Sequence, residues 1–233
     1  MSWFYFLISP YSEWGKIRLK RWYVLPILVG IISSICNMAV SSHREVLYLK
    51  AESIIRMCPT LTLPEGEALI RLVITLAFLL LPLWCIVKVF IISKVIRVGV
   101  KDIDYDKILL ISSLSLLPIL FSNLISTYLL LAKGFDGLVD LKDLDIALAP
   151  TIFSPLNRDM LNNDILFMII REINISNIWS IIILVATFKA EGIDPKKTLG
   201  LYILSLGLIR VIEIIYQMNS SKILWFIFIG GRH

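Results

Sequence analysis

Two opposite charges inside an apolar stretch are the residues of this chain best suited to chemistry. Arg210 and Glu213 lie within Thr198–Met218, and their i, i+3 spacing places them on the same side of a helix. Ionisable residues inside a membrane segment are costly and usually mark a substrate site, a proton site or a contact with a charged partner helix. The alternative is a neutralised pair that faces the core of a helix bundle. The pair is therefore a candidate intramembrane interaction site.

Other polar or helix-breaking residues interrupt the apolar stretches. Asn37 ends a stripe of small residues that begins at Gly30, a pattern that favours close helix packing, and Asn123 lies beside a serine face in a later stretch. Pro82 and Pro118 are expected to kink their helices, because each proline leaves a carbonyl oxygen four residues earlier without its partner. Such kinks can shape a cavity, but kinked helices without any transport role are common.

The sequence offers no catalytic constellation. It contains no GxSxG, HExxH or phosphate-binding-loop pattern. The cysteines Cys36, Cys58 and Cys85 lack zinc-ligand spacing, and the chain has only the histidines His43 and His233. We therefore predict a protein that is not an enzyme and that has no metal or other cofactor, with an intramembrane enzyme as the least favoured alternative.

The composition indicates which environment must surround these residues. Of the 233 residues, 58% are hydrophobic and 18% are charged, whereas soluble domains have about 45–50% and about 25%. This excludes an ordinary cytosolic enzyme, a disordered protein and a nucleic-acid-binding domain. The net charge of +5 does not restore a nucleic-acid function, because the basic residues flank apolar stretches. The class is a polytopic helical membrane protein embedded in the lipid bilayer.

Apolar stretches near the length of a membrane-spanning helix, about 20 residues, recur along the chain. They are Trp22–Val40, Leu72–Ile92, Ile108–Ala132, Ile173–Phe188 and Thr198–Met218. The sequence thus predicts an all-α bundle of five transmembrane helices over residues 22–218, with outer loops 42–71 and 133–172.

Basic residues suggest how these helices are oriented. Lys and Arg are dense in the short flanks before the first stretch, between the second and third, and between the fourth and fifth, and they are sparser in the long loops. The positive-inside rule then places the N-terminus in the cytoplasm and the C-terminus outside. We expect the membrane to be a prokaryotic cell (inner) membrane. Lys88 lies near the inner end of the second stretch, and we expect it to extend to the lipid headgroups.

Three segments are expected to lie outside the hydrocarbon. Residues 1–21 are rich in aromatic side chains and predict a cytoplasmic interfacial segment. Leu156–Ile173 has apolar residues on one helical face and predicts an amphipathic outer helix. The tail 219–233 contains the apolar run Ile223–Ile229, which is too short to span and is expected to dock at the outer interface or on a partner.

Several short motifs follow one another in a characteristic order. They are SPYSEWGKIRLKRWYVLPILVGI near the N-terminus, Gly99-Val100-Lys101 and Tyr105–Leu109 before the third stretch, Ser112-Ser113 and Pro118 within it, and Ile175–Trp179 followed by Lys189, Lys196 and Lys197. Their order and spacing resemble the Yip family, the five-span membrane proteins named for Ypt/Rab-GTPase interaction, and in particular its prokaryotic branch. The resemblance implies five spans with the N-terminus inside and the C-terminus outside.

Functional expectations follow from this resemblance and from its departures. The long cytoplasmic N-terminal region and the DLYGP segment of eukaryotic members are absent, so GTPase binding and vesicle trafficking are not carried over. Some bacterial relatives resemble accessory subunits of ABC exporters. The first hypothesis is a scaffold or accessory subunit that binds a membrane protein, such as an ABC exporter, or a second copy of itself. The alternative is a stand-alone transport protein with a cavity near the kinked second and third spans and the Arg210/Glu213 pair.

Overall fold

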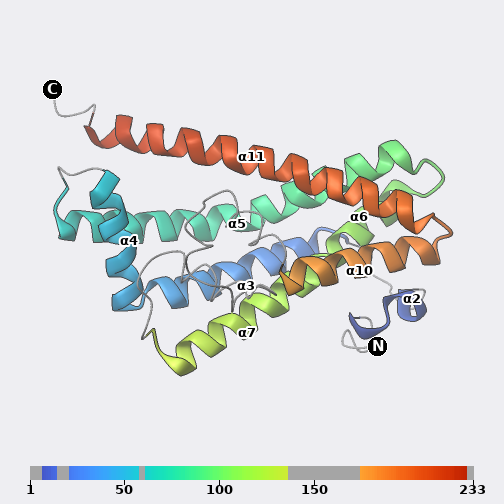
Figure 1. Ribbon diagram of the computed structural model, residues 1–233, viewed down its shortest axis with the longest axis horizontal. Helices are drawn as coiled ribbons and strands as arrows, with labels where there is room; N and C mark the ends of the chain where they lie inside the picture. Colours follow the sequence, from blue (N-terminus) through green and yellow to red (C-terminus); the bar gives the residue numbers. More distant parts are fainter. Residues whose placement is uncertain (1–6, 15–20, 58–60, 136–173, 230–233) are drawn as a thin grey trace, which may run out of the picture.

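The computed structural model describes residues 7–14, 21–57, 61–135 and 174–229, and the regular elements of these residues are helices (Figure 1). In chain order they are α2 (Pro10–Glu13), α3 (Val24–Ser41), α4 (Arg44–Met57), α5 (Leu63–Gly99), α6 (Tyr105–Leu114), α7 (Leu117–Lys133), α10 (Ile175–Ala190) and α11 (Pro195–Ile229).

Most of the long helices run along one axis, as expected for a bundle that crosses a bilayer (Figure 1). Four segments are long and apolar enough to cross it, and they are Val24–Ser41, Phe78–Gly99, Tyr105–Ala132 and Pro195–Ile215. The shorter apolar helix α10 packs among them. The predicted all-α membrane fold is therefore confirmed, and the protein is an integral membrane protein with four to five apolar helices.

Helix α5 is longer than its apolar stretch predicted. It begins after Thr62, where the Glu65 side chain accepts a hydrogen bond from the Thr62 backbone N–H at 2.9 Å and completes a capping box. From there it runs 37 residues without interruption, a length of about 55 Å against a hydrocarbon core of about 30 Å. The early turns escaped prediction because their charged residues lower the hydropathy without weakening the helix.

Helix α4 occupies much of the segment predicted as the outer loop 42–71. It lies across the ends of the spanning helices (Figure 1), and it buries Val46, Leu47 and Ala51. This is an amphipathic helix at the end of the bundle, at a position where none was expected. The one predicted at Leu156–Ile173 lies outside the described residues.

The third apolar stretch forms two helices. Helix α6 ends at Leu114, Ser115 and Leu116 make a turn, and α7 begins at Leu117. Pro118 therefore lies in the first turn of α7, where its missing N–H leaves no gap in the helix. The structure thus differs here from the predicted kink in a continuous helix. Pro82, by contrast, does lie inside α5.

The half of the bundle around α6 and α10 is well packed and rich in small hydroxyl residues, and it is called the packed half. Its core includes Ile108, Ile183 and Phe188, none of which is exposed. Several buried serines, among them Ser113, Ser180 and Ser205, donate to carbonyl oxygens of their own helices, as Ser180 Oγ does to Ser176 O at 2.8 Å. This bonding satisfies a hydroxyl in an apolar interior, and the small side chain lets helices approach closely.

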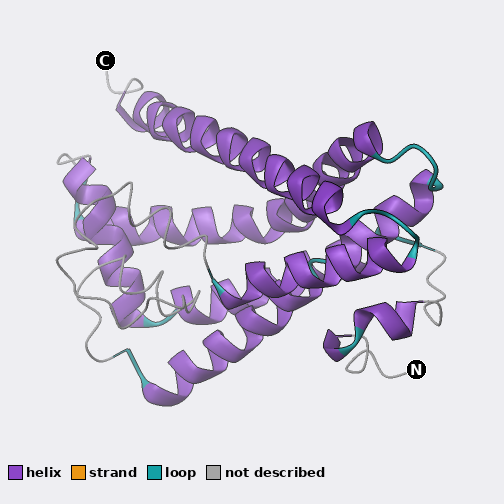
Figure 2. Ribbon diagram, turned by 45° about the vertical axis from the view of Figure 1, so that its right-hand side comes forward, coloured by secondary structure: helices purple, strands orange, loops and turns teal. Residues whose placement is uncertain are grey.

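Helix α11 continues through the predicted tail to Ile229. Its first half is buried at Thr198, Tyr202, Ser205 and Ile209, which recur at helical spacing. Its second half diverges from the bundle (Figure 2). The apolar run Ile223–Ile229 is thus the end of a long helix.

Two ends of the bundle are distinguished below. The end that holds α2 and the loops 100–104 and 191–194 is called the basic end. The end where α4 lies is called the α4 end, and α11 points toward it (Figure 1).

Candidate functional site

A group of polar side chains between α5 and α11 is the candidate functional site. It consists of Trp84, Lys88, Arg210 and Glu213 and is called the charged cluster. Glu213 Oε1 accepts hydrogen bonds from Lys88 Nζ at 2.9 Å and from Trp84 Nε1 at 3.2 Å. Glu213 Oε2 is bound by Arg210 Nη1. The carboxylate is thus held from both helices at once.

Helix geometry explains why these side chains meet. Trp84 and Lys88 are one helical turn apart on α5, and Arg210 and Glu213 are one turn apart on α11. The side chains of Lys88, Arg210 and Glu213 are 28%, 43% and 18% exposed. The cluster is therefore only partly enclosed, and part of it is open to whatever surrounds the bundle.

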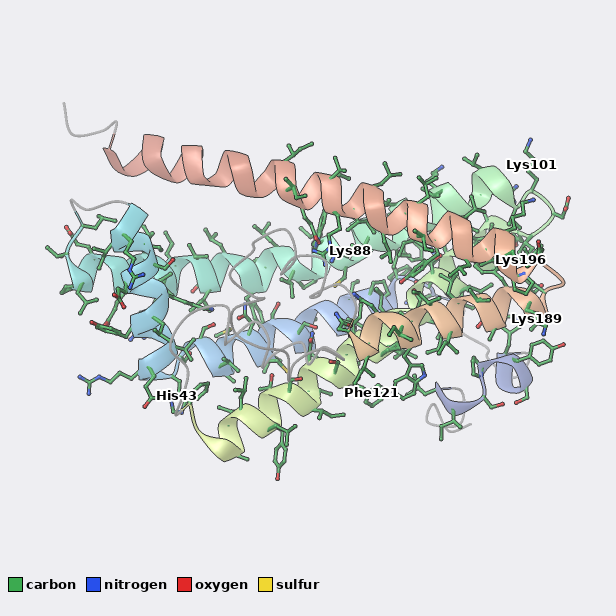
Figure 3. All side chains as sticks on the ribbon, in the orientation of Figure 1. His43, Lys88, Lys101, Phe121, Lys189 and Lys196 are labelled. Atoms are coloured by element: carbon green, nitrogen blue, oxygen red, sulfur yellow. The ribbon has the colours of Figure 1, made fainter. Side chains whose placement is uncertain are left out.

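The depth of the cluster corrects the expectation for Lys88. Lys88 lies about 16 Å along α5 from Gly99, the end of the apolar span, which is about half of a hydrocarbon core. It pairs with Glu213 and does not extend to the headgroups. Figure 3 shows it about halfway along the bundle. The sequence could have indicated this pair, because burying a lysine and a glutamate of two apolar helices together costs less free energy than burying each of them alone.

The chemistry open to the charged cluster is binding and positioning. Glu213 is its only acid, so the carboxylate pair used in general acid–base catalysis is missing from it. Over the described ranges, no group of three or more His, Cys, Asp or Glu residues is arranged to hold a metal ion. The Lys88 ammonium lies 5.6 Å from the centre of the Trp84 ring, which adds a cation–π contact. The cluster joins α5 to α11 and offers polar groups at mid-depth.

The two candidate asparagines lie elsewhere. Asn123 Nδ2 donates to Ser33 Oγ at 2.9 Å and links α7 to α3. Asn37 Oδ1 accepts from Ser41 Oγ at 3.1 Å, and Ser41 Oγ accepts from Lys50 Nζ at 2.6 Å. These bonds hold α3 against its neighbours, so neither asparagine joins the charged cluster.

Pro82 is packed against α3. A Cβ atom added at Gly30 would lie 2.4 Å from Pro82 Cα, so the two helices touch at backbone level. Lys88 on the same helix reaches α11, on another side of α5. The residues named for a transport cavity are therefore divided among different contacts, with Pro118 at the start of α7.

A second polar junction lies at the basic end and was missed by sequence reasoning. Glu191 Oε1 accepts from Trp14 Nε1 at 2.6 Å, and Glu191 Oε2 pairs with Lys107 Nζ at 3.1 Å. Trp179 Nε1 donates to the Leu7 carbonyl at 2.9 Å. The N-terminal segment is thus tied to α10 and to the turn that follows it. The aromatic residues predicted an interfacial segment, but no local pattern pointed to Glu191.

Comparisons with known proteins give one family. The model of the Yip1 domain matches residues 4–215, which is most of the chain. No curated protein and no solved structure matches it.

Proposed function

Because the chain belongs to the Yip1 domain family of membrane proteins, we propose that it is a non-enzymatic scaffold or accessory subunit of a membrane complex. It binds a transmembrane helix of another protein along α11 and α5. An ABC exporter is one such partner, and a second copy of the chain is another. The N-terminus lies in the cytoplasm in this proposal, on the side of the basic end.

The observation that carries the proposal is the exposure of α11 beyond Ile209. Val211, Ile212, Ile214 and Ile215 are each between 41% and 54% exposed. Successive residues turn by about 100° around a helix, so these side chains share one side of α11, about 160° wide and opposite to Glu213. The charged cluster ties this part of α11 to α5.

Helix α5 adds a second exposed apolar surface. Leu72, Leu76, Leu79 and Leu83 recur at helical spacing, and each is about half exposed. Together with the exposed residues of α11 they are called the docking face. An apolar surface of this kind suits lipid and a partner helix equally, but the partly exposed charged cluster between α5 and α11 offers a partner helix polar contacts that lipid tails lack.

Copurification tests the proposal. After gentle detergent extraction from its native membrane, the wild type is expected to bring down a membrane subunit in a fixed ratio. Val211→Trp with Ile215→Trp should reduce the recovery of that subunit at least several-fold, because bulky rings block close helix packing. Ile125→Trp is the matched control, since Ile125 is 58% exposed on α7, away from the docking face.

The depth of the charged cluster favours one second candidate, a transport protein that works alone. A monodisperse chain that moves a solute across liposomes by itself, and that loses this activity as Arg210→Ala with Glu213→Ala, would support it and would overturn the scaffold proposal.

Impermeant thiol labelling tests the orientation in intact cells. In a cysteine-free background, Arg44→Cys should react from outside and Asp194→Cys should not, and the reverse pattern would invert the proposed topology.

A further inference from the structure

Lysine side chains gather at the basic end of the bundle. Lys101 lies in the loop after α5, Lys189 in the last turn of α10, and Lys196 and Lys197 in the first turn of α11. All four are exposed. Figure 3 shows Lys101, Lys189 and Lys196 together at this end of the molecule.

Two backbone features bring these lysines together. A Cβ atom at Gly99 would lie 2.4 Å from Leu201 Cδ1, so the end of α5 touches the start of α11. Gly192 has a φ of +82°, which side chains disfavour, and it turns the chain sharply between α10 and α11. The gathering of charge is therefore built into the helix packing.

The chain's excess charge lies, by sequence, in three segments that flank the apolar stretches. By sequence, the segments 13–21, 94–107 and 189–197 contain eleven Lys and Arg and six Asp and Glu, a difference equal to the net charge of +5 of the whole chain. Everything outside these segments is neutral in sum. The acids at this end, which include Asp102, Asp104 and Asp106, reduce the positive charge but do not balance it.

The exposed lysines of the basic end differ in whether they form ion pairs within the described chain. At this end, Lys107 is paired with Glu191, and Asp194 Oδ1 accepts from the backbone N–H of Lys196 at 3.1 Å. Across the ranges that the structure describes, Lys101, Lys196 and Lys197 form no ion pair. Lys189 Nζ lies 5.9 Å from the centre of the Tyr11 ring. Their ammonium groups are thus available to an external anion.

The α4 end is different. Arg56 pairs with Glu52 at 2.8 Å, and Lys50 Nζ donates to Ser41 Oγ. In α4 and the first turns of α5, Arg44, Lys50, Arg56 and Arg71 are accompanied by as many acids, which are Glu45, Glu52, Glu65 and Glu67. The two ends therefore differ in how closely acids accompany their cations.

We propose that the basic end binds the phosphate groups of anionic phospholipids through Lys101, Lys189, Lys196 and Lys197. The occupant is a lipid headgroup because these lysines lie directly beyond apolar spans, where headgroups are found. Tyr11 and Trp14 lie at the same end, and such rings prefer the membrane–water boundary. The lipids would fix this end of the protein at one leaflet.

Spin-labelled lipids in reconstituted bilayers test the proposal with the full chain. The wild type should restrict labelled phosphatidylglycerol several-fold more than labelled phosphatidylcholine, and salt at about 1 M should abolish the difference, because the Debye length falls to about 3 Å. Lys101→Gln with Lys196→Gln and Lys197→Gln should remove most of this several-fold preference, because each lysine near the membrane surface attracts anionic lipid. Arg44→Gln with Arg56→Gln and Arg71→Gln removes three exposed cations from the α4 end and should leave the preference unchanged.

Three outcomes would overturn the proposal. One is a triple lysine variant that keeps the full preference while its thermal unfolding matches the wild type. Another is an equal loss in the triple arginine variant, which would indicate a non-specific charge effect. The last is displacement of the labelled lipid by a short DNA duplex at equal phosphate concentration, which would identify a nucleic acid as the better ligand.

Discussion

Thr198, Tyr202, Ser205 and Ile209 are buried on one side of α11 near the basic end, whereas Val211, Ile212, Ile214 and Ile215 are exposed and the helix diverges from the bundle (Figure 2). Both halves are apolar in sequence. The difference lies in the neighbours, because the first half packs against helices that carry small residues and the stretch after it is tied to α5 through Glu213. A membrane helix therefore need not be equally stabilised along its length, and the loosely held half is the better place for a partner.

A large effect is expected from removing the bonds of Glu213 to Lys88 and Arg210. Glu213→Ala leaves Lys88 and Arg210 in the membrane without their shared carboxylate, and it should lower the free energy of unfolding by about 2–3 kcal/mol, somewhat less than for a fully buried pair. Unfolding in mixed micelles measures the change. The double variant Glu213→Met with Lys88→Met should recover part of the loss, because it removes opposite charges together. Equal stability of Glu213→Ala and the wild type would show that the cluster does not anchor α11.

The close packing of α3 against α5 can be tested at Gly30. Gly30→Ala places a methyl group against the Pro82 backbone, which cannot move aside like a side chain, so we expect a loss of about 1–3 kcal/mol. Gly207→Ala is the matched control, since a Cβ there meets nothing within 4 Å, and it should be neutral or slightly stabilising. Thermal unfolding in detergent compares the two variants, and a neutral Gly30→Ala would argue against backbone-level packing.

The junction at the basic end should contribute less. Glu191→Gln weakens the contact with Lys107 while keeping an oxygen for Trp14, and we expect a loss of about 1 kcal/mol or less because the lysine is half exposed. Hydrogen exchange of residues 7–14 should become faster, and Glu191→Ala should have the larger effect. If exchange in this segment is unchanged in both variants, Glu191 does not hold the N-terminal segment in place.

The smallest effect on stability is expected on the exposed half of α11. Ile215→Ala removes a side chain that is 53% exposed, so the change in thermal unfolding should stay within about 0.5 kcal/mol. Leu184→Ala in the packed half, where Leu184 is fully buried, should cost about 2–5 kcal/mol by the same measurement. Similar losses in the two variants would erase the contrast between the halves of the bundle.

Sequence reasoning predicted more of the fold than of the site. The apolar stretches identified the spanning helices, since hydropathy over about 20 residues is a local property. The Arg210–Glu213 pair was also within reach, because i, i+3 neighbours meet on any helix. Helix α4 and the early turns of α5 were missed, because their charged residues keep the mean hydropathy of these segments low.

The sequence by itself determined that this protein is embedded in a bilayer, which segments are apolar enough to cross it, and which segments carry its net positive charge. These follow from composition and short-range order, which do not depend on how helices pack. Only the tertiary structure decided that Lys88 and Trp84 share Glu213, that Pro82 packs on Gly30, and that α11 is buried on one side up to Ile209 and exposed over residues 211–215 except at Glu213. Trp84 and Glu213 are 129 residues apart, and contacts over such separations depend on which helix faces become neighbours, which no local pattern specifies.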